Sequence, residues 1–588
     1  MSPSSPVRSL IHSDRFKAAL IVAAILTTSL AAMSSNCADP DLWGHVEYGR
    51  EVLRDRGLPS TATWTFAAKG AEWVNHENIA ELMLAWTVDT FGPGALPWMK
   101  LSIATTILLL LITSARHSGA GWLSIAIVCT LVASNLQFHW HYRPQILTYL
   151  SLALLLTLWQ SVFSNLQYTD ESIAVLQRRL KRLWLLPLLM CFWANSHGGF
   201  AAGVAIVGVY HLLVCLQIVR ATAWRHRSAL FQLSLVTMTA IAATLVNPYG
   251  TTLWKFMLDA LQLPRPEIAD WAPLELFGNE AVRFWCLLAV VGLGLIPDRG
   301  RRDLAQVVLI ALLLWQGMSH CRHLSIFAIV CGFWIPRHLH HVYEIAARSL
   351  RRMQPPAITL SATVQSQPTL ASSLAMTLLV AINLVRLAPS LQPVQVERTE
   401  YPVSAMQFMQ DRTLTGNVIV TFNWAQYAIG CFAANNSTNT QSLVAVDGRF
   451  ETCYPREITD IYFDFWFGTT DPKQRFRSPK SADIDPSRAL TYCQPDLVLI
   501  AREQLPSVRV MAEHQNDWTL LYQDSLSQLW GRQSKYDDTS SAGFLPANQR
   551  QIGETEQFGT ITWPAYPVRR SLHDRMTSGP PSDAELSM

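Results

Sequence analysis

Two carboxylates and an imidazole lie close together, directly after the first long apolar run of the chain. The segment reads Asp39-Pro40-Asp41-Leu42-Trp43-Gly44-His45, and the apolar run before it extends from Ala18 to Met33. Ionisable groups at the end of a membrane-length run are costly to place, so they indicate a functional site. Asp39 or Asp41 could take a proton as a general base, and either could hold a divalent cation through its oxygens.

Further polar groups stand at the ends of later apolar runs. Asn75-His76-Glu77 follows in the same polar segment, and Glu77 could join Asp39 and Asp41 as a ligand of Mg²⁺ or Mn²⁺. Arginine can bind a phosphate through two N–H groups at once, which makes Arg143 and Arg322 candidates for an anionic substrate. The other candidate substrate-binding residues are His45, Asn75, His76, Glu77, Asn195 and His197.

Each of these groups also has a purely structural interpretation. Asp39-Pro40-Asp41 could cap the helix that follows, because Asp is a preferred N-cap residue. Asn75-His76-Glu77 could order its own loop, and Asn195 and His197, which precede two glycines, could shape a tight turn. Arg322 could pair with an acid across the helices. The sequence leaves both interpretations open.

The composition indicates a membrane protein with a polar domain attached. Half of the 588 residues are hydrophobic and 15% are charged, and the mean hydropathy of +0.17 is too apolar for a soluble chain of this length. The net charge of +3 gives no reason to expect nucleic acid as a partner. About eleven apolar runs are long enough, or nearly so, to cross the hydrocarbon layer. They are Ala18–Met33, Leu96–Ser114, Gly119–Ser134, Pro144–Phe163, Leu183–Asn195, Phe200–Ile218, Ala229–Val246, Ala281–Ile296, Leu304–Met318, Leu324–Pro336 and Leu370–Leu387.

Lysine and arginine gather in alternate loops between these runs, and this predicts an orientation in the plasma (inner) membrane. Because cytoplasmic loops carry the excess of basic residues, the N-terminus is predicted to be cytoplasmic. Asp39, Glu77, Arg143, His197 and Arg322 then all fall on the outer side. This topology favours an active or binding site on the outer face.

The first outer loop, from Asn36 to Ala95, is too long for a simple connection. It carries two amphipathic patterns, from Gly44 to Arg56 and from Glu77 to Thr90, that predict helices. These helices could lie along the membrane surface or pack as protein core. A polytopic α-helical membrane domain is thus predicted for residues 1–388, with residues 36–95 as its large outer loop.

The apolar runs stop near Ala388, and short apolar strands follow. Val418–Val420, Leu443–Val446, Leu497–Ile500 and Leu520–Tyr522 alternate with helical stretches, which predicts a soluble α/β domain on the outer side over residues 389–534. Residues 535–588 are rich in Ser, Pro and charged residues, and this composition predicts a disordered tail.

These motifs resemble those of the GT-C superfamily of membrane glycosyltransferases, which carry an acidic residue just after the first span and a large first outer loop. More closely, the chain resembles a bacterial membrane-protein family of this type with the pattern Asp-Pro-Asp-x-Trp-Trp-His. Here Gly44 replaces the second tryptophan. The match continues through Trp73-Val74-Asn75-His76-Glu77, Arg143-Pro144-Gln145, the segment from Trp193 to Phe200, Asn247-Pro248-Tyr249-Gly250 and Asp447-Gly448-Arg449.

This resemblance implies a GT-C-like fold and a membrane glycosyltransferase. Such an enzyme is embedded in membrane lipid. It takes a sugar from a polyprenyl-phosphate-linked donor and passes it to a glycan, lipid or protein acceptor. Asp39 or Asp41 is then the candidate base, and His76, Arg143 and Arg322 would stabilise the leaving phosphate. Two other functions stay open, namely a transporter or lipid flippase and a non-enzymatic scaffold on a degenerate GT-C fold. In a transporter, polar residues would line a pathway near the middle of the membrane.

Overall fold

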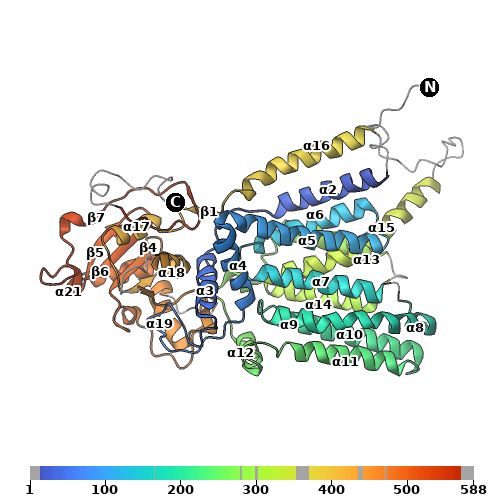
Figure 1. The fold of residues 1–588 in the computed structure, drawn as a ribbon, viewed down its shortest axis with the longest axis horizontal. Helices are drawn as coiled ribbons and strands as arrows, with labels where there is room; N and C mark the ends of the chain where they lie inside the picture. The colour runs from blue at the N-terminus through green and yellow to red at the C-terminus, as the bar shows by residue number, and fades with distance from the viewer. Residues whose placement is uncertain are drawn as a thin grey trace.

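The computed structural model describes residues 14–164, 166–278, 281–297, 302–352, 370–434, 442–468, 471 and 473–570. Long helices form a bundle at one end of the molecule, an α/β domain forms the other end, and the first loop lies between them (Figure 1). The predicted helical membrane region and the predicted α/β region are therefore both present. The first loop and the α/β domain lie at the same end of the bundle, as the sequence predicts.

A helix occurs at each of the eleven predicted apolar runs. Six helical segments are long and apolar enough to cross a membrane, and three shorter apolar helices accompany them. The count of eleven spans stays a prediction. The bundle helices are α2 (Asp14–Met33), α5 (Leu96–His117), α6 (Trp122–Leu136), α7 (Gln145–Phe163), α8 (Asp170–Arg179), α9 (Leu186–Ala194), α10 (Phe200–Thr222), α11 (Arg227–Ala243), α12 (Thr251–Gln262), α13 (Ala281–Leu295), α14 (Leu304–Ser319), α15 (Leu324–Arg352) and α16 (Leu370–Leu387).

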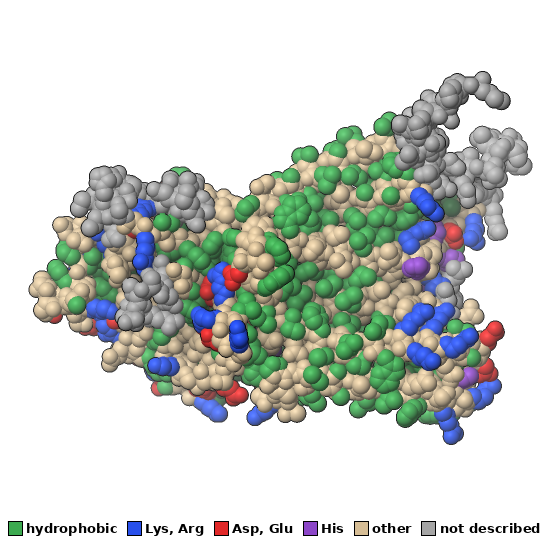
Figure 2. Space-filling model, viewed as in Figure 1, with side chains coloured by type: hydrophobic (Ala, Val, Ile, Leu, Met, Phe, Trp, Pro, Cys, Tyr) green, Lys and Arg blue, Asp and Glu red, His purple; other side chains and the backbone are tan. Residues whose placement is uncertain are grey.

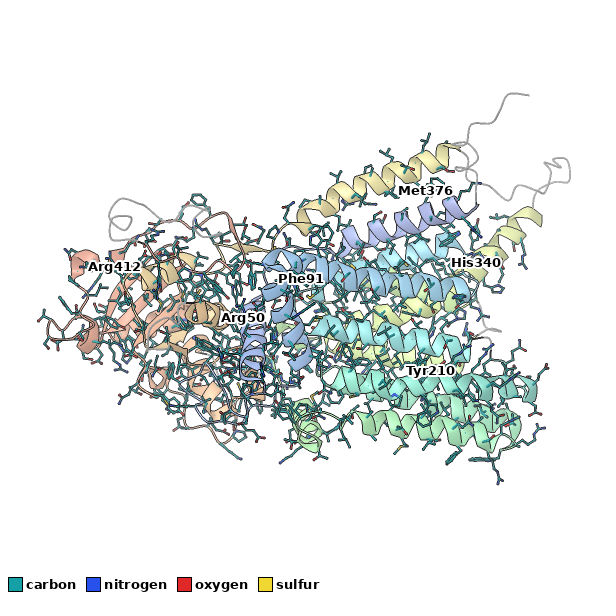
Figure 3. The ribbon with its side chains drawn as sticks, viewed as in Figure 1. Arg50, Phe91, Tyr210, His340, Met376 and Arg412 are labelled. Carbon is teal, nitrogen blue, oxygen red and sulfur yellow. The ribbon has the colours of Figure 1, made fainter. Side chains whose placement is uncertain are left out.

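The first loop contains the two predicted helices, α3 (Leu42–Asp55) and α4 (Asn78–Phe91). Helix α3 packs against α4 and against α18 (Ala425–Ala434) of the α/β domain, so it is part of a protein core. Helix α4 also exposes Trp86 (54%) and Phe91 (63%), and Phe91 lies beside the end of the bundle (Figure 3). Exposed aromatic rings are typical of the membrane–water interface. Core packing accounts for α3, whereas α4 combines packing with a surface suited to the interface.

The α/β domain is built on a six-stranded sheet with the order β3-β2-β4-β6-β5-β7. Strands β3, β2 and β4 run parallel, and β6 is antiparallel to β4. The sequence predicts β2, β3, β4 and β5 but not the remaining strands. The strands are β1 (Gln395–Glu397), β2 (Asn417–Val420), β3 (Leu443–Val444), β4 (Leu497–Ala501), β5 (Trp518–Gln523), β6 (Ser527–Arg532), β7 (Gln551–Ile552) and β8 (Thr560–Thr562), and the helices are α17 (Val403–Asp411), α18, α19 (Arg456–Phe467), α20 (Leu505–Glu513) and α21 (Gln533–Tyr536).

The first loop and the α/β domain share one hydrophobic core. Thr65 forms a parallel bridge with Val444, so the loop extends the sheet beyond its edge strand β3. Pairing through main-chain hydrogen bonds fixes the register of two segments that are far apart in the sequence. The loop is therefore held to the domain by backbone pairing as well as by side-chain packing.

The segment after Lys535 differs from its predicted disorder as far as Arg570. Strand β8 pairs with β1, and Trp563 and Ala565 are buried in the domain core. The indole of Trp43 donates to the carbonyl of Pro564 at 2.8 Å. A few apolar side chains thus anchor a segment whose overall composition is polar. The last part of the predicted tail, residues 571–588, lies outside the described residues.

Lysine and arginine side chains gather at the end of the bundle that faces away from the α/β domain, and a broad hydrophobic surface separates the two ends (Figure 2). An apolar belt of this kind, bounded by charged ends, is what a membrane-spanning bundle requires. The chain is therefore described as a membrane protein.

Candidate active site

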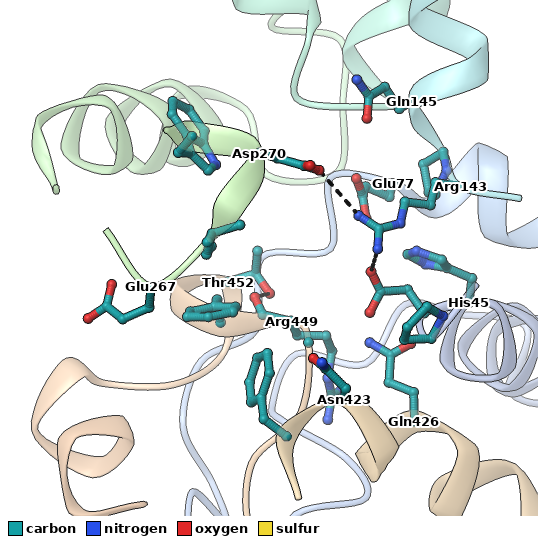
Figure 4. A pocket seen from close by; sticks show the side chains of 18 of the residues that line it. His45, Glu77, Arg143, Gln145, Glu267, Asp270, Asn423, Gln426, Arg449 and Thr452 are labelled. Atoms are coloured by element: carbon teal, nitrogen blue, oxygen red, sulfur yellow. Dashed lines mark hydrogen bonds and ion pairs between the residues drawn. The ribbon is translucent and has the colours of Figure 1, made fainter. Parts of the chain in front are cut away.

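A cavity of about 580 Å³ lies where the first loop, the ends of the bundle helices and the α/β domain meet (Figure 4). Cavities of this size are typical of small-molecule and cofactor sites. Its polar lining includes eight of the ten candidate site residues. These are Asp41, His45, Asn75, His76, Glu77, Arg143, His197 and Arg322.

Asp39 lies behind the cavity wall and holds Arg143. The Nε atom of Arg143 donates to both carboxylate oxygens of Asp39, at 2.7 and 2.8 Å, and Asp39 is 3% exposed. Burial would raise the pKa of Asp39, but the adjacent guanidinium lowers it below its usual value. Asp39 also accepts the backbone N–H of Asp41 at 3.0 Å. It therefore stays ionised and positions Arg143 and the start of α3.

Asp41, in contrast, faces the cavity. It occupies the N-cap position of α3, but its side chain makes no capping hydrogen bond. One carboxylate oxygen lies 3.2 Å from a terminal nitrogen of Arg143. Burial, together with the charges of Asp39 and Glu77, raises the pKa of Asp41 above its usual value. A carboxylate with a raised pKa in a cavity is better suited to accept a proton than one held by a full ion pair.

Glu77 is surrounded by histidines. One of its oxygens lies 3.8 Å from Nε2 of His76 and 3.6 Å from Nε2 of His197. Burial would raise the pKa of Glu77, but these imidazoles, His45 and Arg322 lower it. Burial lowers the pKa of His197 to about 3, so this ring is neutral. Its Nδ1 accepts the N–H of Gly199 at 2.9 Å, which leaves Nε2–H to face Glu77.

His45, Glu77 and Glu81 form the group best placed to hold a metal ion. Each offers one ligand atom, and these atoms lie within 4.8 Å of one another. The predicted set of Asp39, Asp41 and Glu77 is not assembled in this way, because Arg143 occupies both oxygens of Asp39. Burial would lower the pKa of His45, but its hydrogen bond to Glu81 and nearby carboxylates raise it to about 9. When no metal ion is bound, a protonated His45 can therefore neutralise part of the negative charge of Glu77 and Glu81.

Arg322 and Trp271 form another part of the wall. The guanidinium lies 4.7 Å from the centre of the Trp271 ring, and it makes no ion pair within the described part of the chain. The predicted pairing of Arg322 with an acid across the helices is therefore not observed there. Asp270, beside Trp271, lies 3.8 Å from Arg143 (Figure 4). Arg143 and Arg322 present two cationic groups to one cavity, which suits an anionic substrate.

The α/β domain supplies the opposite wall of the cavity from the carboxyl ends of three parallel strands. Thr421, Phe422 and Asn423 follow β2, Gly448 and Arg449 follow β3, and Gln504 follows β4. Ligands commonly bind at this edge of parallel sheets, because the loops there vary freely while the strands hold them in place.

Gln426 of α18 fills the space that a larger residue at position 44 would need. A Cβ atom on Gly44 would lie 2.1 Å from Oε1 of Gln426, and one on Gly448 would lie 2.5 Å from Asp41 Oδ1 and 2.7 Å from Gln426 Nε2. Gln426 is 3% exposed, and its Oε1 has no hydrogen-bond partner among the described residues. The glycine that departs from the family pattern thus makes room for a polar side chain beside Asp41.

No protein-family model and no curated protein matches this sequence. Solved structures of an oligosaccharyltransferase from Archaeoglobus fulgidus do match in fold. The apo form has a TM-score of 0.54 at 12% identity over 87% of this chain and 72% of that chain. The complex of this enzyme, AglB, with an inhibitory peptide and a dolichol-phosphate has a TM-score of 0.53 at 12% identity, over 86% and 71%. A form tethered to an acceptor peptide has a TM-score of 0.52 at 10% identity, over 95% and 76%.

The chain shares the fold of this oligosaccharyltransferase. Within this fold, Asn195 is the one candidate besides Asp39 that does not line the cavity. Its side chain donates to the carbonyls of Cys191 and Val246 at 2.8 and 2.9 Å, so it shapes the turn after α9. Glu81, Asp270 and Gln426 line the cavity but carry no sequence signal that separates them from ordinary polar residues.

Proposed function

We propose that this chain is a membrane glycosyltransferase that moves a sugar from a polyprenyl-phosphate-type donor to an acceptor on the outer face of the plasma (inner) membrane. The observation that carries this proposal is the lining of the cavity, where Asp41 shares one space with Arg143 and Arg322. A base and two phosphate-binding groups must reach the same glycosyl phosphate for such a transfer. The dolichol-phosphate bound by AglB, which shares the fold, supports a lipid-linked donor.

In the proposed reaction, Asp41 accepts the proton of the acceptor nucleophile. The nucleophile forms a new bond to the anomeric carbon of the sugar while the bond from that carbon to the phosphate oxygen breaks. Negative charge then gathers on the departing phosphate, where Arg143 and Arg322 stabilise it. Asp39 contributes by positioning Arg143, because a guanidinium held through Nε turns its two terminal nitrogens toward the cavity, where they face Asp41 and Asp270.

A divalent cation such as Mg²⁺ or Mn²⁺ is part of this proposal. His45, Glu77 and Glu81 are the residues that would hold it, since carboxylates with one imidazole suit Mn²⁺ in particular. Bound there, the cation would supply Lewis-acid stabilisation to phosphate oxygens. Asn75 supports this group, because its side-chain amide donates to Glu81 at 2.6 Å.

The proposed orientation places the N-terminus in the cytoplasm and the α/β domain outside. Basic side chains gather at the end of the bundle opposite the cavity (Figure 2), as expected for the cytoplasmic side. Eleven spans would also put the two ends of the chain on opposite sides. Reporter fusions at Lys69 in the first loop and at Lys535 in the domain test this, because cytoplasmic signal at either position excludes an outer site.

The decisive experiment compares three aspartate-to-asparagine variants in cells that lack the native copy. Labelled monosaccharide is followed from the lipid-linked pool into acceptors. Asp41→Asn keeps the size of the side chain but removes proton acceptance, so transfer should fall by about 10²- to 10⁴-fold with normal protein abundance. Asp39→Asn should lower abundance as well, because Arg143 loses its charged partner. Asp89→Asn on the exposed face of α4 is the matched control and should keep wild-type transfer.

Three results would each count against the proposal. Full transfer in Asp41→Asn removes the assignment of the base. A purified protein that moves a lipid-linked sugar across a bilayer without transferring it would instead identify a flippase, and a purified protein that shows neither activity would favour a scaffold.

A further inference from the structure

A second cavity, of about 730 Å³, lies toward the end of the bundle that faces away from the α/β domain. It is formed by α7, α10, α14 and α15 together with the segment after α7. Tyr210, one of its lining residues, lies within the bundle and away from the active site (Figure 3). None of its lining residues belongs to the cavity proposed for sugar transfer.

Three aromatic rings form one side of this second cavity. Trp159 stacks on Tyr210 with ring centres 4.1 Å apart, and Tyr210 stacks on Trp334 at 5.8 Å. All three side chains are buried, so their positions are fixed by packing. Such a rigid apolar wall can receive the uncharged part of a ligand at little cost in conformational entropy.

The other side of the second cavity carries two arginine side chains. Arg302 and Arg337 line it, and neither forms an ion pair with a carboxylate in the described ranges, although one terminal nitrogen of Arg302 donates to the carbonyl of Ile296. Asp303, the one acidic residue in the lining, already accepts the N–H of Ala305 at 2.9 Å and the amide of Gln217 at 3.1 Å. The lining therefore carries two arginines and an acid that is engaged in capping α14.

Two polar atoms of the lining also lack partners. The Nε of Arg302 and the hydroxyl of Tyr168 are buried without a hydrogen-bond partner among the described residues. Tyr168 has a φ of 52°, in the left-handed region that residues other than glycine rarely adopt. Buried donors without partners and a strained backbone together indicate a place where a ligand supplies the missing contacts.

We propose that this second cavity binds a phosphate ester, with its oxygens on Arg302, Arg337 and the Tyr168 hydroxyl and its uncharged part against the aromatic wall. Phosphate oxygens match the positive charge of this lining and its unpartnered donors, the Nε of Arg302 and the hydroxyl of Tyr168, and arginine binds phosphate through several N–H groups at once. The ester could be the headgroup of an anionic lipid in the inner leaflet or a soluble organic phosphate. The binding is independent of sugar transfer, because the two cavities share no residue.

The test uses the purified full-length chain and two probes. Native mass spectrometry counts phosphatidylglycerol retained against phosphatidylcholine, and thermal shift reports on glycerol 1-phosphate in solution. The test variant is Arg302→Gln/Arg337→Gln. The matched control is Arg225→Gln/Arg348→Gln, which removes the same charge from side chains that are 65% and 68% exposed. Loss of hydrogen bonds to a charged group should weaken binding about tenfold or more in the test variant only.

The outcomes separate the two sources of phosphate. If the wild type and the control variant retain phosphatidylglycerol and the test variant does not, the ligand is a lipid headgroup. If glycerol 1-phosphate raises the melting temperature of the wild type and the control variant but not of the test variant, the ligand is a soluble ester. Tyr168→Phe removes one hydroxyl without altering charge or packing, so it should weaken the same ligand by a smaller factor. The proposal would be overturned if the test and control variants bound each probe equally well. It would also be overturned if a folded test variant bound either probe as tightly as the wild type does.

Discussion

Replacing Arg449 should separate the first loop from the α/β domain. Its guanidinium lies between the rings of Tyr48 and Trp73, 4.5 and 4.6 Å from their centres. It also pairs with the fully buried Asp447 at 2.7 Å and donates to the carbonyl of Thr63 at 2.6 Å. One side chain thus joins α3 and the segment between the two helices of the first loop to the turn after β3 that carries Asp447.

The magnitude of the Arg449→Leu effect follows from what is left behind. Asp447 has 0% exposure, and removal of one partner from a buried ion pair costs about 3–5 kcal/mol. The two cation–π contacts add about 0.5–2 kcal/mol each where the cation is desolvated. At 1.4 kcal/mol for each factor of ten, loss of the ion pair alone, which lowers the opening free energy by about 3–5 kcal/mol, makes exchange about 10²- to 10⁴-fold faster, and loss of the cation–π contacts adds to this.

Amide hydrogen exchange is the appropriate measurement, because Phe66 and Val444 pair the loop with β3 through their N–H groups. Exchange of these two amides should accelerate in Arg449→Leu, while that of core strand β4 stays slow. The matched control is Arg502→Leu, because the Arg502–Glu554 pair lies at the surface and should contribute about 0–1 kcal/mol. Equal exchange at Phe66 and Val444 in the two variants would refute the reasoning.

Three further predictions concern the active site. Because burial raises the pKa of Asp41, transfer should fall as the pH drops through that raised value, and an acid limb of the pH–rate profile at the usual aspartate value of about 3.9 would contradict this. Gly44→Leu should abolish transfer through collision with Gln426, and Gly44→Leu/Gln426→Ala should recover part of it, whereas a double variant no better than the single one would exclude the clash. EDTA should lower transfer and Mn²⁺ should restore it, with more Mn²⁺ required in Glu81→Gln, and transfer that is insensitive to EDTA would remove the cation.

The helices could be predicted from the sequence because apolar runs are a local property. Ala18–Met33 and Phe200–Ile218, for example, are apolar along their whole length, so no tertiary contact is needed to expect a helix there. Strand β6 could not be predicted in the same way. It has only six residues, Ser-Gln-Leu-Trp-Gly-Arg, with no regular alternation of polar and apolar side chains, and its partners are β4 and β5.

The candidate site was predictable in its members but not in their roles. Asp39 and Asp41 are two residues apart and have the same chemistry, yet Arg143 takes both oxygens of one and leaves the other facing the cavity. That difference depends on how the start of α3 is oriented toward a residue 104 positions away. Gln426 lies still further along the chain, and only the docking of α18 against α3 brings it beside Asp41.

The hydrogen bond from Trp43 to the carbonyl of Pro564 also has a consequence for biosynthesis. The two residues are 521 positions apart, and at about 5–20 residues per second a ribosome needs from about half a minute to nearly two minutes to make the intervening chain. During that time α3 can already pack against α4 and α18, but the indole of Trp43 still lacks the carbonyl that it binds in the finished domain. A segment made long after the first loop therefore completes its packing, so a chain truncated before Pro564 should be cleaved by proteases in the first loop more readily than the full-length chain.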